Sequence, residues 1–244
     1  VAVEKNYSML LPSLYYQRIV TAATTLRPLC GWGTIGTITG VTTVTAGAVA
    51  VATGFVDPVQ DFSPPVTQGW WRPWSALIVP GLVEEVIWRA AWLPIPPVIA
   101  TVPDYPTTVS VALRQLTSVL RLLLANGTGT TTAAATAPSP QLVTLYQTAL
   151  VVWVIHVVSH PMVATLADPR RRAVLDDWRF GGLAVIVLGG TTLSYIVSGG
   201  CLMAAVVTHA VPVALWRDVW GGERRLRAAT APGEECHNDK NNDN

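Results

Sequence analysis

Ionisable side chains are rare in the apolar parts of this sequence, and they gather in three places. The segment GLVEEVIWRAAWLP, residues 81–94, carries two adjacent glutamates and an arginine, and two later segments, HVVSH and HAVPV, carry three histidines. The six residues are Glu84, Glu85, Arg89, His156, His160 and His209. An unpaired charge inside a membrane costs about 3 kcal/mol or more, so these residues indicate a functional site.

The two glutamates are expected to have different roles. Glu85 and Arg89 are four residues apart, which places them on one helix face in the order that favours an ion pair. Glu84 lies about 140° around the same helix from Arg89 and must face something else. A carboxylate without an arginine partner is suited to take a proton from water and to return it later. The alternative for the Glu85–Arg89 pair is a structural clamp between helices.

The composition predicts that a membrane surrounds these groups. Half of the 244 residues are hydrophobic, only 13% are charged, and the mean hydropathy is +0.40; a soluble domain carries nearly twice that charge. Segments of about 20 mainly apolar residues can span a bilayer. The candidates are 33–55, 76–100, 109–125, 142–166, 181–197 and 201–216, of which 109–125 could instead lie in the interface. We therefore expect an all-α membrane protein, a polytopic bundle of about six transmembrane helices with an intramembrane polar cavity.

The basic residues support an even number of spans under the positive-inside rule. With the N-terminus on the positive side, Arg72 falls on the opposite side with little else. The positive side then collects Lys5, Arg18, Arg27, Arg170, Arg171, Arg172, Arg179, Arg217, Arg224, Arg225 and Arg227. We expect an interfacial segment at 1–32, a transmembrane domain at 33–220 and a polar, disordered tail at 221–244. The net charge of +1 gives no reason to expect a nucleic-acid partner, and the oligomeric state stays open.

The histidines can reach the depth of Glu84. Counted from the side with few charges, Glu84 and His209 each lie about eight residues into their helices, or about 12 Å at 1.5 Å per residue. His160 comes level with them if its helix begins near Gln147. A carboxylate and two imidazoles in a water-filled cavity would make a hydrolytic site, in which one activates water and the others donate to the developing oxyanion.

Zinc binding is the alternative chemistry for these side chains. His156 and His160 have the i, i+4 spacing of zincins, but HVVSH lacks the glutamate of HExxH. A zinc ion could still be held by Glu84, His160 and His209. Apart from this alternative we expect no cofactor. A single buried histidine can also be a hydrogen-bonded residue of the core with no further role.

Three motifs in order resemble those of the CPBP family (CAAX protease and bacteriocin-processing, or Abi), which includes the type II CAAX prenyl endopeptidases. EEVIWR, residues 84–89, fits the first motif, EExxxR. HVVSH resembles the second, FxxxH, with His160 as the histidine, and HAVPV resembles the third, HxxxN, with His209. The run SYIVSGGCLMAAVVTHAVPVALW, residues 194–216, is similar to the cyanobacterial and plastid members, as is the His-Pro pair at Pro161. The resemblance covers about residues 75–217.

The resemblance implies an all-helical, glutamate-dependent intramembrane endopeptidase. Glu84 would activate the attacking water with the assistance of His160, and His209 would help to stabilise the oxyanion. Glu85 and Arg89 would orient the site. The implied partners are the lipid bilayer and a membrane-associated peptide or protein substrate, for which a prenylated CAAX-type tail is one possibility. A multi-pass location in a plastid or bacterial-type membrane is favoured, with the endoplasmic reticulum as the alternative.

Two positions depart from the family motifs. His156 stands in place of the aromatic residue of FxxxH, and Trp153 is close enough in sequence to fill its packing role. Val213 stands in place of the asparagine of HxxxN, and a valine side chain cannot donate a hydrogen bond. Losing one oxyanion donor typically costs about 10²–10³ in rate. Val213 therefore favours a second hypothesis, a catalytically weak or inactive scaffold or immunity-type member of the same fold.

Overall fold

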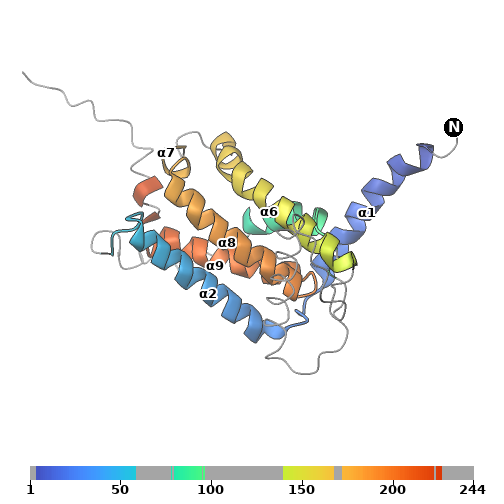
Figure 1. Cartoon of the computed structure of the whole chain (residues 1–244), viewed down its shortest axis with the longest axis horizontal. Helices are drawn as coiled ribbons and strands as arrows, with labels where there is room; N and C mark the ends of the chain where they lie inside the picture. The colour runs from blue at the N-terminus through green and yellow to red at the C-terminus, as the bar shows by residue number, and fades with distance from the viewer. Residues whose placement is uncertain are drawn as a thin grey trace, which may run out of the picture.

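The computed structural model describes residues 4–58, 78, 80–94, 96, 140–167, 172–222 and 224–226. Every regular element within these ranges is a helix (Figure 1). The elements are α1 (Glu4–Thr24), α2 (Gly31–Ala52), a π-helical turn η1 (Val86–Ala91), α6 (Pro140–Ala167), α7 (Arg172–Leu175), α8 (Trp178–Val197) and α9 (Leu202–Asp218).

Three of these helices are long and apolar enough to cross a membrane. The qualifying stretches are Gly31–Ala52 in α2, Val143–Met162 in α6 and Trp178–Val197 in α8. Large apolar side chains such as Val44 and Val158, each 71% exposed, lie on the outer faces of α2 and α6. Lipid tails can cover such apolar faces without a cost in free energy, whereas their exposure to water is unfavourable. The described part of the chain is therefore that of an all-helical membrane protein.

Four predicted spans coincide with helices: 33–55 with α2, 142–166 with α6, 181–197 with α8 and 201–216 with α9. The expected span at 76–100 is longer than the helix in the structure. The helix that includes Glu84 ends at Ala91, and residues 92–94 are not helical. Pro94 has no N–H to donate and disfavours helical geometry in the residue before it. The expected segment 109–125 and residues 227–244 of the tail lie outside the described residues, so the total of six spans stays a prediction.

The core of the fold is the packing of α2, α8 and α9 on one another, with α6 against α8 (Figure 1). The helix η1 contacts α1, α6 and α9, and α1 then extends away from the other helices. Hydroxyl groups join the first three helices: Thr208 Oγ1 of α9 lies 2.9 Å from Thr39 Oγ1 of α2 and 2.8 Å from Ser194 Oγ of α8. Small and hydroxyl side chains are typical of close helix contacts in membranes.

A tight turn connects α8 to α9. Gly199 and Gly200 have φ of 72° and 87°, a left-handed conformation that glycine adopts without a steric penalty. Ser198 Oγ accepts a hydrogen bond from the backbone N–H of Cys201 at 3.1 Å and so fixes the start of α9. The short connection makes α8 and α9 antiparallel neighbours, so that side chains from both helices can face η1.

The other end of α8 is fixed by Asp177, which is its N-cap. The carboxylate accepts a hydrogen bond from the backbone N–H of Arg179 at 2.9 Å and pairs with the Arg179 guanidinium at 2.6 Å. Hydrogen bonds from that side chain, more than any other cause, lower the pKa of the Asp177 carboxyl. Arg179 also donates to the carbonyl of Gly54 at 3.0 Å, which ties the start of α8 to the end of α2.

Candidate active site

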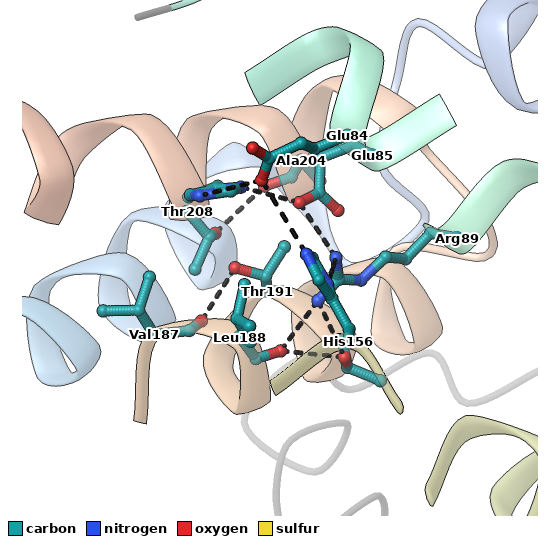
Figure 2. A network of polar contacts seen from close by, with 11 residues as sticks. Glu84, Glu85, Arg89, His156, Val187, Leu188, Thr191, Ala204 and Thr208 are labelled. Atoms are coloured by element: carbon teal, nitrogen blue, oxygen red, sulfur yellow. Dashed lines mark hydrogen bonds and ion pairs between the residues drawn. The ribbon is translucent and has the colours of Figure 1, made fainter. Parts of the chain in front are cut away.

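Arg89 is the centre of a buried polar network and has no exposed surface. Its Nη1 atom lies 3.0 Å from Glu85 Oε1 and 2.8 Å from His156 Nδ1. Its Nη2 atom donates to the carbonyl of Leu188 at 3.1 Å and to Thr192 Oγ1 at 3.2 Å. One guanidinium therefore joins η1 to α6 and α8 (Figure 2). The Glu85 contact is the ion pair that the i, i+4 spacing predicts.

Glu85 extends the same network to α9. It is fully buried, and its Oε1 atom lies 2.8 Å from His209 Nδ1. Arg89 and His209 thus share one carboxylate oxygen from opposite sides. Since a carboxylate carries several acceptor sites, both contacts can be hydrogen bonds at once. Glu85 accordingly has the role of a connector between the arginine and the last helix.

Glu84 lies beside Glu85 at the same two imidazoles and has no arginine ion pair among the described residues. Its Oε2 atom lies 3.7 Å from His156 Nε2 and 3.7 Å from His209 Nε2. These distances exceed those of direct hydrogen bonds. A water molecule that lies off the line between Oε2 and either Nε2 atom could still bond to both. The Glu84 side chain is 33% exposed, whereas those of His156 and His209 are 1% and 8% exposed. The carboxylate therefore faces two buried imidazoles from a side chain that is itself partly exposed.

His160 lies one helical turn beyond His156 on α6. Its ring centroid is 6.0 Å from that of His156 and 5.9 Å from that of Phe180. Its Nδ1 atom is buried and has no hydrogen-bond partner in the described part of the chain. No described hydrogen bond joins His160 to Glu84. The structure thus brings Glu84 and His209 together, and the second imidazole against this carboxylate is that of His156.

Trp88 provides the aromatic contact that was expected from Trp153. The Trp88 ring stacks on the imidazole of His156, with centroids 4.7 Å apart and planes at 14°. Trp153 instead donates from Nε1 to the carbonyl of Val185 at 3.3 Å and packs at Gly189, where α6 approaches α8. The spacing between Glu84 and Trp88 is one helical turn, so the sequence contained a signal for this stacking, and it was missed.

The residues from Val86 to Ala91 form a π-helical turn rather than a regular α-helical one. Such turns are rare and frequently occur at functional sites. Here the turn contains Trp88 and Arg89 and follows directly on Glu85, so it presents the network to α6, α8 and α9. No residue in EEVIWRAA marks a π-turn in advance.

The third motif position, Val213, lies one turn after His209 on α9 and is half-buried. Its side chain adds no donor to the site. The neighbouring Pro212 also has no backbone N–H, so it cannot bond the carbonyl of Thr208 within the helix. Within the described residues, no three His, Cys, Asp or Glu side chains are grouped as metal ligands.

Comparison of the chain with protein-family models, with curated proteins and with solved structures finds no match. The site is therefore defined by its own geometry: a partly exposed carboxylate that faces two imidazoles, each imidazole held from behind by the Arg89–Glu85 pair.

Proposed function

We propose that this protein is an intramembrane endopeptidase of the CPBP type. A water molecule activated by Glu84 would hydrolyse a peptide bond in a membrane-associated substrate, for example a prenylated CAAX-type tail. The remaining predicted spans would complete a bundle of about six helices around a polar cavity. The observation that carries the proposal is the position of the Glu84 carboxylate, 3.7 Å from two buried imidazoles, on a side chain that is partly exposed.

The proposed reaction assigns each group a task. Glu84 takes a proton from the water as the water oxygen attacks the carbonyl carbon, with His160 in an assisting role. Imidazole N–H groups stabilise the negative charge that develops on the carbonyl oxygen, and His209 contributes when its Nε2 carries a proton. When the C–N bond breaks, Glu84 returns the proton to the departing nitrogen. Glu85 and Arg89 keep the imidazoles in place throughout, because each of them holds one ring at its far nitrogen.

The decisive experiment compares wild type with Glu84→Gln in liposomes that contain a quenched prenyl-peptide. Removing a general base costs typically about 10²–10⁴ in rate, so we expect cleavage by the variant to fall by at least that lower bound. The thermal stability of Glu84→Gln should fall little, because the contacts of Glu84 Oε2 with His156 and His209 are 3.7 Å long and neither is a hydrogen bond of ordinary length. Val83→Ala, an exposed neighbour on the same helix, controls for expression and insertion.

Equal cleavage by wild type and Glu84→Gln would contradict the proposal. A chelation arm of the same assay tests the zinc alternative, since a reaction that needs zinc held by Glu84, His160 and His209 should be lost on treatment with a strong chelator. Hydrolysis by Glu84 and water alone should persist under that treatment.

The second candidate function is a membrane scaffold or immunity-type protein of the same fold. The specific observation in its favour is Val213, which offers no donor where the resembled motif has an asparagine. Wild-type protein that is folded, yet cleaves neither prenylated nor unmodified peptides faster than empty liposomes, would favour this candidate.

A further inference from the structure

We infer that His156 is a catalytic residue whose Nε2–H donates to the oxyanion, in place of the amide that Val213 lacks. The inference rests on the proposed function, because it assigns a further role within the same hydrolysis. In the motif that the sequence resembles, the position of His156 is an aromatic residue without a polar group, so the role follows from this chain's own geometry.

Arg89 fixes which nitrogen of His156 carries the proton. A guanidinium has only donors, and Arg89 Nη1 lies 2.8 Å from His156 Nδ1. Nδ1 must therefore be the acceptor, and the single proton of the neutral ring is on Nε2. Adding a second proton at Nδ1 would place two N–H groups head to head beside a permanent positive charge. Arg89 thus holds His156 in the neutral form with its donor at Nε2.

The nearest protein group to that donor is the Glu84 carboxylate, at 3.7 Å. His156 Nε2 is buried and has no hydrogen-bond partner among the described residues, and the same is true of Glu84 Oε2 opposite it. Buried polar groups in native proteins are nearly always hydrogen-bonded, so each exception calls for an explanation. Two such atoms that face each other across 3.7 Å, beside the exposed part of Glu84, indicate a place for a ligand with polar oxygens.

The separation of the two atoms fits the transition state. The attacking oxygen and the oxyanion are bonded to the same carbon, so the groups that hold them must be close neighbours. Glu84 Oε2 and His156 Nε2 can each reach one of these oxygens by a hydrogen bond of about 2.8 Å. Stacking on Trp88 holds the ring plane of His156, which gives the donor a fixed direction.

His209 differs from His156 in how its donor arises. Its Nδ1 atom faces Glu85 Oε1 at 2.8 Å, and an ionised carboxylate only accepts hydrogen bonds. The first proton of His209 is therefore on Nδ1, and its Nε2 donates only when the ring carries a second proton. The structure supplies a permanent donor on His156 and a conditional one on His209.

The kinetic test uses His156→Asn in the liposome assay. The Asn oxygen can accept from Arg89 as Nδ1 does, but the short side chain has no donor at the place of Nε2. We expect kcat to fall by about 10²–10³ with little change in KM, and Tm to fall because the stacking of the ring on Trp88 is lost. Adding Val213→Asn should restore at least about tenfold in this background, and much less in wild type, because the amide then replaces a missing donor. Val158→Ala, on the exposed face of α6, is the control.

A residue that only supports Arg89 would behave differently. Because His156→Asn keeps an acceptor for Arg89, its kcat would then stay near that of wild type, and an amide placed on α9 would not raise it. If Glu84→Gln is inactive while His156→Asn stays within about threefold of wild type, the inference is wrong and the proposed function stands. If wild type shows no Glu84-dependent cleavage, the proposed function fails and the catalytic role of His156 fails with it.

The proton position can be measured without any activity. In protein labelled with ¹⁵N-histidine, the ring signals that disappear in His156→Asn should be one protonated Nε2 and one unprotonated Nδ1. Signals of the opposite tautomer, or of a doubly protonated ring, would overturn the inference even in a protein that cleaves peptides.

Discussion

Replacing Arg89 by methionine should strongly destabilise the fold. The change keeps an unbranched side chain of similar length but removes a guanidinium that is fully buried. It leaves the Glu85 carboxylate without its cation and His156 Nδ1 without its donor, whereas the Leu188 carbonyl keeps the hydrogen bond from Thr192 Oγ1. Removing one partner of a buried ion pair costs about 3–5 kcal/mol, because the other charge stays buried and uncompensated.

Thermal unfolding in detergent, followed by near-ultraviolet circular dichroism, measures this cost. For a chain of 150–250 residues, 1 kcal/mol corresponds to about 2–4 °C in Tm, so Arg89→Met should melt about 6–20 °C below wild type. Adding Glu85→Gln removes the uncompensated charge and should recover part of the loss, which makes the double-mutant cycle strongly non-additive. Arg89→Lys keeps the charge without the fork of donors, and its Tm should be intermediate.

A Tm for Arg89→Met within about 2 °C of wild type would refute this reasoning. It would mean that the contacts of the guanidinium do not hold η1 to α6 and α8. Additive effects of Arg89→Met and Glu85→Gln would be equally damaging, because they would show that the two side chains do not share one stabilising interaction.

Two further predictions use the same measurement. Gly190→Ala places a Cβ against the side chain of Thr42 and should destabilise the α2–α8 contact by about 1–3 kcal/mol; Gly182→Ala, with open space at its Cβ, should not lower Tm. Asp177→Asn keeps a capping oxygen but loses the charge that pairs with Arg179. Because the folded-state pKa of Asp177 is lowered, the stabilisation is complete above its unfolded pKa of about 3.9 and is lost as pH falls through the folded pKa. The Tm gap between wild type and Asp177→Asn should therefore be present at about pH 6 and narrow as pH falls below about 3.9, and a gap of equal size at about pH 6 and about pH 2 would contradict it.

The long helices could be predicted because apolar length alone determines them. The expected segments 33–55, 142–166, 181–197 and 201–216 differ from α2, α6, α8 and α9 by only a few residues at each end. The residue at which each helix begins or ends depends on local features, namely prolines, glycines and capping residues such as Asp177 at the start of α8. The pairing of Glu85 with Arg89 was also predictable, because a spacing of four residues fixes a shared face before any tertiary contact forms.

The contacts between helices could not be predicted in the same way. His160 reaches the depth of Glu84 only if its helix begins near Gln147, whereas α6 begins at Pro140. His156 and His160 are one turn apart on the same face, so the earlier start brings His156 to this level, and it is His156 that contacts Arg89. The π-turn changes the angular spacing within η1, which a count at 100° per residue does not include.

The two glutamates differ in whether helix packing explains their presence. Glu85 is fully buried and has both Arg89 and His209 as partners, so helix packing explains its presence. Glu84 is not needed to hold either ring at Nδ1, because Arg89 holds His156 there and Glu85 holds His209. It lies 3.7 Å from the Nε2 atom of each ring, and its Oε2 atom is buried without a hydrogen bond of ordinary length from the described residues. Polar groups whose presence helix packing does not explain are where function is expected. Glu84 is therefore the carboxylate best placed to activate water, and this favours the hydrolytic proposal over the scaffold.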